Sequence, residues 1–141
     1  MIECWVDSSF DEKRNVAGIG ILITNKGKRR IYSLFTNART NNEAELFAIH
    51  LANILTHGQG TIYTDSQTAI DYINRNIKDK PRTQEKWLNH KYCEYWAYQI
   101  RKSPCCVEKV KAHTNNFKTH SIGNRLADLL AKDGRGRYYE R

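Results

Sequence analysis

Long apolar stretches are missing from this chain of 141 residues. No run approaches the roughly 18 apolar residues that a membrane-spanning helix needs. No basic and apolar leader precedes the first predicted strand, so we expect neither a secretory signal nor a membrane partner. Only two prolines occur and 40% of the residues are hydrophobic, which argues against disorder.

Cysteines are few, and their spacing fits neither a zinc site nor a disulfide framework. Cys4, Cys93, Cys105 and Cys106 contain no C-x-x-C pair. Reduced thiols in a cytoplasmic or nuclear compartment are the simplest interpretation. We therefore expect a cytoplasmic protein.

Acidic residues are outnumbered, since 23 Lys+Arg face 15 Asp+Glu and the formal net charge is +8. Polyanions are the natural partners of such a surface, although a basic surface can also serve solubility alone. The length suits one domain with a substantial core, and no repeat or internal linker divides it. We expect a single domain over residues 1–133 and a basic, frayed tail over residues 134–141.

The first part of the chain has the patterns of strands. Residues 2–10 alternate apolar and polar positions, and the closely spaced glycines of residues 16–23 suggest a second, tightly packed strand. A turn at residues 25–28 leads to a third strand at residues 30–35. Three strands joined in this way predict an antiparallel meander.

Helical spacing then takes over. Residues 40–43 match a capping box at the start of a helix, which Gly58 and Gly60 end. The later elements predicted are a strand at 61–64, a helix around 69–73, a helix over 84–102, a strand at 107–110 and a helix over 122–132. This order predicts an α/β fold with a mixed sheet and helices on its faces.

Four acids from distant segments fall where such a fold would direct them to one point. Asp7 lies inside the first strand, Glu45 lies one turn into the first helix, Asp65 ends a strand and Asp128 lies on the last helix. Clustered carboxylates repel one another unless divalent cations neutralise them. In a basic chain, this cluster predicts metal-assisted chemistry on phosphates.

Each acid also has an ordinary structural interpretation. Asp65 could be a turn or cap residue, and Glu45 would suit the helix dipole regardless of function. Asp128 could pair with a basic residue one turn away on its own helix. Asp7 is the hardest to explain in this way, because an acid between apolar strand residues needs a partner.

Taken in order, four segments of the chain resemble ribonuclease H of type 1. They are residues 4–7, 40–46, 63–67 and 123–131. The resemblance covers essentially the whole chain and implies a five-stranded mixed sheet, three antiparallel strands followed by parallel additions, flanked by helices on both faces. It also implies a monomeric endonuclease that hydrolyses the RNA strand of RNA–DNA hybrids and leaves 5′-phosphate ends.

The resemblance further implies a metal centre. In that family four acids hold two Mg²⁺ ions, and here they would be Asp7, Glu45, Asp65 and Asp128, with Asp7 bridging the ions and Mn²⁺ able to substitute. In-line hydrolysis of a phosphodiester needs an activated water and a stabilised leaving oxygen, which two cations roughly 3.5–4 Å apart can supply. Mg²⁺ prefers oxygen ligands and keeps several waters, so a few carboxylates suffice.

Substrate contacts follow from the same resemblance. Asn41, Asn42 and Gln67 would lie along the minor groove of the hybrid, where the ribose 2′-hydroxyl distinguishes RNA from DNA. Thr40 would contact a phosphate of the DNA strand. Turn and capping chemistry is the alternative for Asn41 and Asn42, which could serve both purposes.

A basic group surrounds the polar connection at residues 77–83, where many relatives carry a basic protrusion that grips the hybrid. Its members are Arg75, Lys78, Lys80, Arg82, Lys86 and Trp87. Basic residues with an aromatic among them suit phosphate contact and sugar stacking, although a charged loop beside a helix is also common. The connection is too short for an extra helix, so we expect a reduced handle that uses Lys86 and Trp87.

Two departures from the family pattern stand out. The histidine that relatives place before the last acid corresponds to His113, which lies farther from Asp128 than is usual, so the loop is lengthened. An imidazole suits proton handling near neutrality, and His120 is a second candidate for the role. Ser8 stands where glycine commonly follows the first acid, which we expect to alter only the backbone near one metal.

Other functions are conceivable on this fold. A non-catalytic hybrid-binding module would have no reason to retain all four acids. Related 3′ exonucleases usually need a second acid two residues after the first, where this chain has Ser9. Transposases and integrases share the broader fold, but the segments at 40–46 and 123–131 favour ribonuclease H.

Overall fold

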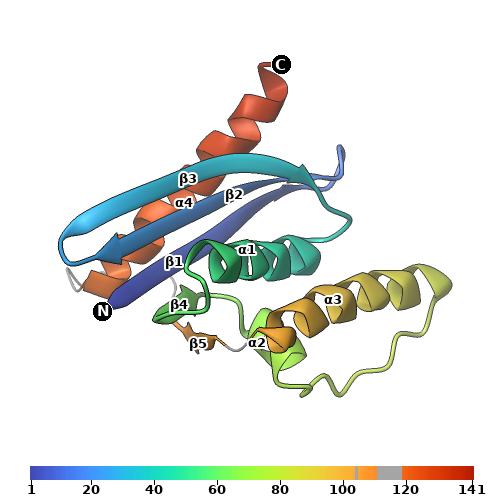
Figure 1. Ribbon diagram of the computed structural model, residues 1–141. Helices are drawn as coiled ribbons and strands as arrows, with labels where there is room; N and C mark the ends of the chain where they lie inside the picture. The colour runs from blue at the N-terminus through green and yellow to red at the C-terminus, as the bar shows by residue number, and fades with distance from the viewer. Residues whose placement is uncertain (104, 111–118) are drawn as a thin grey trace.

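The computed structural model describes residues 1–103, 105–110 and 119–141, with residues 119–121 described by their backbone alone. The elements within these residues are β1 (Ile2–Asp11), β2 (Val16–Asn25), β3 (Lys28–Asn37), α1 (Asn41–Leu55), β4 (Thr61–Thr64), α2 (Gln67–Ile73), α3 (Gln84–Lys102), β5 (Cys106–Lys109) and α4 (Thr119–Tyr139). Their strands form one sheet in the order β3-β2-β1-β4-β5 (Figure 1). None of the helices in these segments is long and apolar enough to cross a membrane.

The sheet is mixed, as the sequence predicts. β1, β2 and β3 pair antiparallel as a meander, while β4 lies parallel beside β1 and β5 lies parallel beside β4. A parallel neighbour cannot be reached by a tight turn, so a helical connection must carry the chain from one strand to the next. α1 provides that connection between β3 and β4. The start of α1 and the end of β4 both lie close to the middle of β1.

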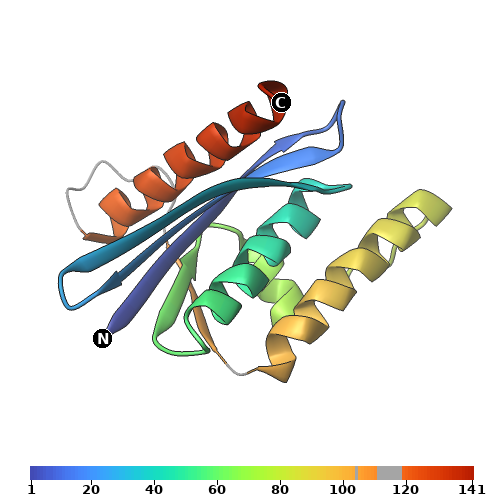
Figure 2. The ribbon, with the colours of Figure 1, turned by 45° about the horizontal axis from the view of Figure 1, so that its top comes forward.

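The two faces of the sheet carry different helices, as Figure 2 shows. Alternation along β1 turns Cys4 and Val6 toward the core that contains α1, whereas Trp5 packs with Ala127 of α4. α3 packs outside α1 and α2 rather than on the sheet. By the same alternation Asp7 lies on the α4 face and Ser8 on the α1 face.

Glycines allow α4 to lie directly on the sheet. A Cβ atom at Gly20 would stand 2.1 Å from the carbonyl oxygen of Ala127, and one at Gly18 would stand 1.8 Å from that of Ala131. Gly20 is the partner of Asp7 in the antiparallel pairing of β1 and β2. One of these close approaches of helix to strand therefore lies beside the strand position that holds the first acid.

The last helix is longer than expected, and the prediction that the chain frays after residue 133 was wrong. α4 begins at Thr119, before residue 122, and continues to Tyr139. Gly134 looked like the end of the helix, but it is a packing residue, since its Cβ would stand 2.1 Å from the carbonyl oxygen of Leu34. The glycine that would end an isolated helix here lets α4 cross β3.

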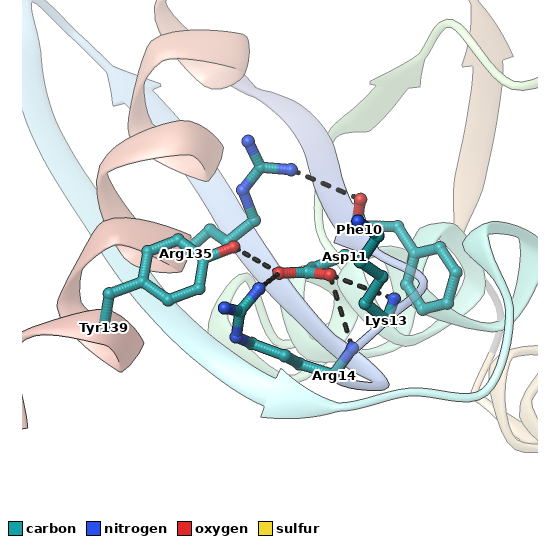
Figure 3. Close-up of polar contacts among 6 residues, drawn as sticks. All are labelled: Phe10, Asp11, Lys13, Arg14, Arg135 and Tyr139. Atoms are coloured by element: carbon teal, nitrogen blue, oxygen red, sulfur yellow. Dashed lines mark hydrogen bonds and ion pairs between the residues drawn. The ribbon is translucent and has the colours of Figure 1, made fainter.

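Polar contacts fasten the end of α4 to the turn between β1 and β2 (Figure 3). The Tyr139 hydroxyl and the Arg14 guanidinium both donate to the carboxylate of Asp11, the latter at 3.1 Å. The guanidinium of Arg135 donates to the carbonyl oxygen of Phe10 at 3.2 Å. The hydrogen bond from Tyr139, together with Arg14, lowers the pKa of Asp11.

The predicted cap at the start of α1 is present in modified form. The Thr40 side chain accepts a hydrogen bond from the backbone N–H of Glu43 at 3.1 Å, as in a capping box. The Glu43 carboxylate, however, accepts from the backbone N–H of Arg39 at 2.9 Å and from the indole of Trp96 at 3.1 Å. Glu43 is buried, so this acid caps one helix and holds another, α3, against it.

Replacing Gly20 with alanine should test the helix–strand contact. We expect Gly20→Ala to destabilise the protein by about 2 kcal/mol or more, because the new methyl group would collide with the backbone of α4. Gly136→Ala is the matched control, since nothing lies within 4 Å of a Cβ at that position of the same helix. Helix propensity predicts that this control is neutral or stabilising by up to about 1 kcal/mol. Urea denaturation of both variants measures the difference, and equal stabilities would contradict the packing role of Gly20.

Candidate metal centre

Strand register places the first and third acids side by side. β1 and β4 pair in parallel with Trp5 opposite Tyr63. Continuing this register by two residues sets Asp65, which directly follows β4, beside Asp7 in the middle of β1. Because side chains alternate along both strands, the two carboxylates emerge on the same side.

The second acid reaches the pair from the first helix. Glu45 lies in the early part of α1, whose start is positioned by the cap at Thr40. One carboxylate oxygen from each of Asp7, Glu45 and Asp65 lies within 4.8 Å of the others. Asp7 is 7% exposed and Glu45 is 4% exposed, so this cluster is held largely out of water.

Asp128 completes the group from the opposite face of the sheet. Its carboxyl group lies within hydrogen-bonding reach of Asp7. Its side chain is 38% exposed and also forms an ion pair with Lys132 at 3.1 Å, which is the structural alternative anticipated from the sequence. The structure thus brings all four predicted acids together, with Asp128 at the outer edge.

Burial and mutual repulsion make these acids hard to ionise. Burial, followed by the charges of Glu45 and Asp65, raises the pKa of Asp7 to about 9, although the N–H of Ser8 opposes the change. Burial also raises the pKa of Glu45 to about 7, against the opposing hydrogen bond from the Ser8 hydroxyl. Perturbed carboxyl groups gathered in one place are typical of functional sites.

The donor set fits a hard divalent cation. Every member is a carboxylate, the ligand type that Mg²⁺ and Mn²⁺ accept. The Oε2 atom of Glu45 is buried and has no hydrogen-bond partner among the described residues. A buried anionic oxygen without a donor is costly, and a cation held by Asp7, Glu45 and Asp65 would satisfy it.

Ser8 contributes a contact that the sequence analysis missed. Its hydroxyl donates to Glu45 Oε1 at 2.7 Å, and its backbone N–H donates to Asp7 Oδ1 at 2.9 Å. The departure from glycine therefore adds a side-chain contact as well as a backbone change. The signal available in the sequence was the alternation of β1, which turns this hydroxyl toward α1.

The predicted substrate residues lie around the same end of α1. Asn41 is exposed, and its Oδ1 lies 3.5 Å from the Ser8 hydroxyl. Asn42 is half-buried at the next position, and Thr40 caps the helix. Gln67 is exposed at the start of α2, where its amide donates to Asp71 at 2.9 Å. Their roles in binding stay predictions.

The basic connection between α2 and α3 contains no helix within its described residues. A pocket of about 810 Å³ lies against it, and its walls are Tyr72, Lys78, Asp79, Lys80, Pro81, Arg82, Lys86 and His90. Tyr72 and His90 were missed from the sequence, and the Tyr72 hydroxyl contacts His90 Nδ1 at 2.9 Å. His90 follows Lys86 by one helical turn, which was the usable signal.

Trp87 stands beside this pocket without lining it. Its side chain is 49% exposed, and the ammonium group of Lys91 lies 4.4 Å from its ring centroid. An exposed indole already paired with a cation can stack on a sugar or base while a neighbouring charge contacts a phosphate. The predicted use of Trp87 in binding stays a prediction.

The predicted histidine cannot be placed. His113 falls within residues 111–118, outside the described residues, and His120 is described only by its backbone in α4. The choice between these two imidazoles therefore stays a prediction from the sequence.

Sequence comparison gives two related findings. Residues 1–135 match the sequence model of the RNase H family. A protein of Schizosaccharomyces pombe (strain 972) named Ribonuclease H is 32% identical over 130 residues, which make up 87% of this chain and 47% of that protein. The chain therefore spans about half the length of this relative.

Solved structures show the same fold. RNase H1 from the halophilic archaeon Halobacterium salinarum NRC-1 aligns with a TM-score of 0.65 at 15% identity, over 96% of this chain and 98% of the other. The N-terminal RNase H domain of a Mycobacterium tuberculosis protein, solved as a fusion with maltose-binding protein, gives 0.64 at 18% identity, over 99% and 96%. At these identities the likeness concerns the fold.

The raised pKa values predict how stability depends on pH. A carboxyl group whose pKa rises on folding binds its proton more tightly in the folded state, so it favours folding below its unfolded pKa and loses that contribution as pH rises through its folded pKa. For Asp7 the change is from 3.8 to about 9, and for Glu45 it is from 4.5 to about 7. In EDTA we therefore expect the wild-type Tm to fall, relative to that of Asp7→Asn, between about pH 5 and pH 9.

Thermal denaturation of both proteins across this range measures the difference. Mg²⁺ should restore the wild-type Tm at pH 8 by neutralising the cluster, and it should affect Asp7→Asn much less. A Tm difference between the two proteins that does not change with pH would contradict the raised pKa of Asp7.

Proposed function

The chain belongs to the RNase H family, and from this we propose that it is an endonuclease that hydrolyses the RNA strand of RNA–DNA hybrids. Two Mg²⁺ ions, replaceable by Mn²⁺, would be held by Asp7, Glu45, Asp65 and Asp128. The observation that carries the proposal is the convergence of these four acids, from β1, the end of β4, α1 and α4, in a chain of net charge +8.

Each acid has a part that its position supports. When bound, the cations would supply an activated water and a stabilised leaving oxygen, so that the RNA strand ends in a 5′-phosphate. Asp7 interacts with each of the other three acids and would help to hold both cations. Glu45 offers its free Oε2 from the α1 side, whereas Asp128 stands at the exposed edge, where a substrate phosphate can approach.

Substrate selection would involve the surface beside the acids. Asn41, Asn42 and Gln67 present amides on one side of the cluster, where they can hydrogen-bond to a ribose 2′-hydroxyl. Thr40 would contact a phosphate of the DNA strand. The basic pocket at the start of α3 and the exposed ring of Trp87 would hold the hybrid farther along.

The assembly state and compartment form part of the same proposal. All four acids come from one chain, so a monomer contains the complete cluster. The four cysteines are free, and burial raises the pKa of Cys4 to about 12 and that of Cys93 to about 11. Unreactive thiols of this kind suit a reducing compartment, and we propose a cytoplasmic location.

Cleavage of a labelled hybrid tests the activity directly. Purified protein with Mg²⁺ should cut the RNA strand of an RNA–DNA duplex and leave the same sequence intact as a DNA–DNA duplex. Asp65→Asn should lower the rate by more than about a hundredfold, since even the outer partners of metal ligands can cost up to that factor. Glu12→Gln removes one charge from an exposed turn and should cleave normally.

A hybrid that survives long incubation with both Mg²⁺ and Mn²⁺ would contradict the proposal. Tight hybrid binding without cleavage by the folded protein would instead indicate a binding module that has lost catalysis.

Salt dependence tests the basic pocket. Each phosphate contact adds about 0.9 to the slope of log affinity against log salt. Arg82 lines the pocket, so Arg82→Ala should reduce that slope by about 1 and weaken binding of all hybrid sequences alike. Arg29→Ala removes the same charge from the exposed start of β3 and should leave the slope unchanged. Fluorescence anisotropy in Ca²⁺ measures binding without turnover, and equal slopes for both variants would remove Arg82 from the interface.

A further inference from the structure

We infer that Ser8 is a positioning residue of the metal centre, whose hydroxyl holds Glu45 so that the second carboxylate oxygen faces the cation. The inference rests on the proposed function to the extent that the four acids bind a divalent metal. It adds a residue that belongs neither to the carboxylate set nor to the substrate surface. Its basis is the hydrogen-bond geometry around one strand position.

Ser8 donates hydrogen bonds to both Asp7 and Glu45. Its hydroxyl lies 2.7 Å from Glu45 Oε1, and its N–H lies 2.9 Å from Asp7 Oδ1. Both contacts are buried. A strand residue thus fixes the acid before it in sequence and the acid on the facing helix at the same time.

The two carboxylate oxygens of Glu45 have different surroundings, and this difference explains how the contact with Ser8 could assist metal binding. Oε1 accepts from Ser8, while Oε2 is buried and has no partner within the described residues. A glutamate side chain has several rotatable bonds, so ordering it costs conformational entropy. The hydroxyl orders the carboxylate before any cation arrives, so less of that cost falls on metal binding.

The hydroxyl cannot serve another acceptor equally well. Asn41 Oδ1 also lies near it, but at 3.5 Å. A serine hydroxyl has one proton to donate, and the shorter contact to a carboxylate is the stronger one. The proton therefore belongs to Glu45, and the amide of Asn41 stays available on the surface.

Metal binding to the free protein separates positioning from a purely structural role. Ser8→Ala removes the hydroxyl while keeping nearly the same volume. We expect it to bind Mn²⁺ about tenfold more weakly than wild type in calorimetric titration, because a hydrogen bond to a charged group is lost. Its cleavage rate at saturating Mn²⁺ should fall much less than its metal affinity. Ser8→Thr keeps the hydroxyl on a β-branched residue suited to a strand and should recover most of the affinity.

Ser9→Ala is the matched control, because it removes a neighbouring hydroxyl from the same strand on the opposite face. It should bind Mn²⁺ as wild type does. Unchanged Mn²⁺ affinity in Ser8→Ala would overturn the inference, as would a folded Ser8→Thr as weak as Ser8→Ala. Circular dichroism in EDTA establishes folding of each variant. A wild-type protein that binds Mn²⁺ but leaves hybrids intact would defeat the proposed function alone and leave this inference standing.

Discussion

Repulsion between buried carboxylates is the constraint on which the arrangement of this protein depends. Acids held within 4.8 Å of one another and away from water oppose folding, so the surrounding structure must supply the free energy that keeps them together. The central strand of the sheet does much of this. β1 has the buried residues Cys4, Trp5 and Val6 directly before Asp7 and is paired with a strand along each edge, so Asp7 is only 7% exposed.

On the other face of the sheet, the contact between β2 and α4 also helps to hold the acids together. Gly18 and Gly20 let the helix backbone touch the strand, and the hydrogen bonds of Tyr139 and Arg135 hold the end of that helix to the β1–β2 turn. Asp128 is therefore positioned by packing on one side and by polar contacts on the other. The glycine packing and the polar contacts both lie outside the carboxylate cluster, yet both hold the helix that brings Asp128 to it.

Local patterns predicted much of this structure. The alternation of the first strand, the cap at Thr40 and the limits of α3 depend on neighbouring residues, and the structure confirms them. Features that depend on contacts between distant segments were missed. Gly134 has the pattern of a residue that ends a helix, and only its contact with β3 shows its packing role. Asp11 accepts a hydrogen bond from a tyrosine 128 positions away. The contact of the Ser8 hydroxyl depends on the position of α1, which the sequence of β1 does not reveal. Proximity of the four acids could be anticipated because the order of strands and helices in the resembled family brings these four segments together.

Glu43 adds polar contacts to the apolar packing between α1 and α3. Its carboxylate joins the turn before α1 to Trp96 of α3, and Arg39 of that turn lies over the ring of Tyr92, 3.6 Å from its centroid. If the proposed hybrid binds at the start of α3, it would contact a helix that Glu43, two positions before Glu45, fastens to the start of α1. Under the proposed function, the surface that holds the duplex and the start of α1, which carries Glu45, would therefore keep a fixed position relative to each other.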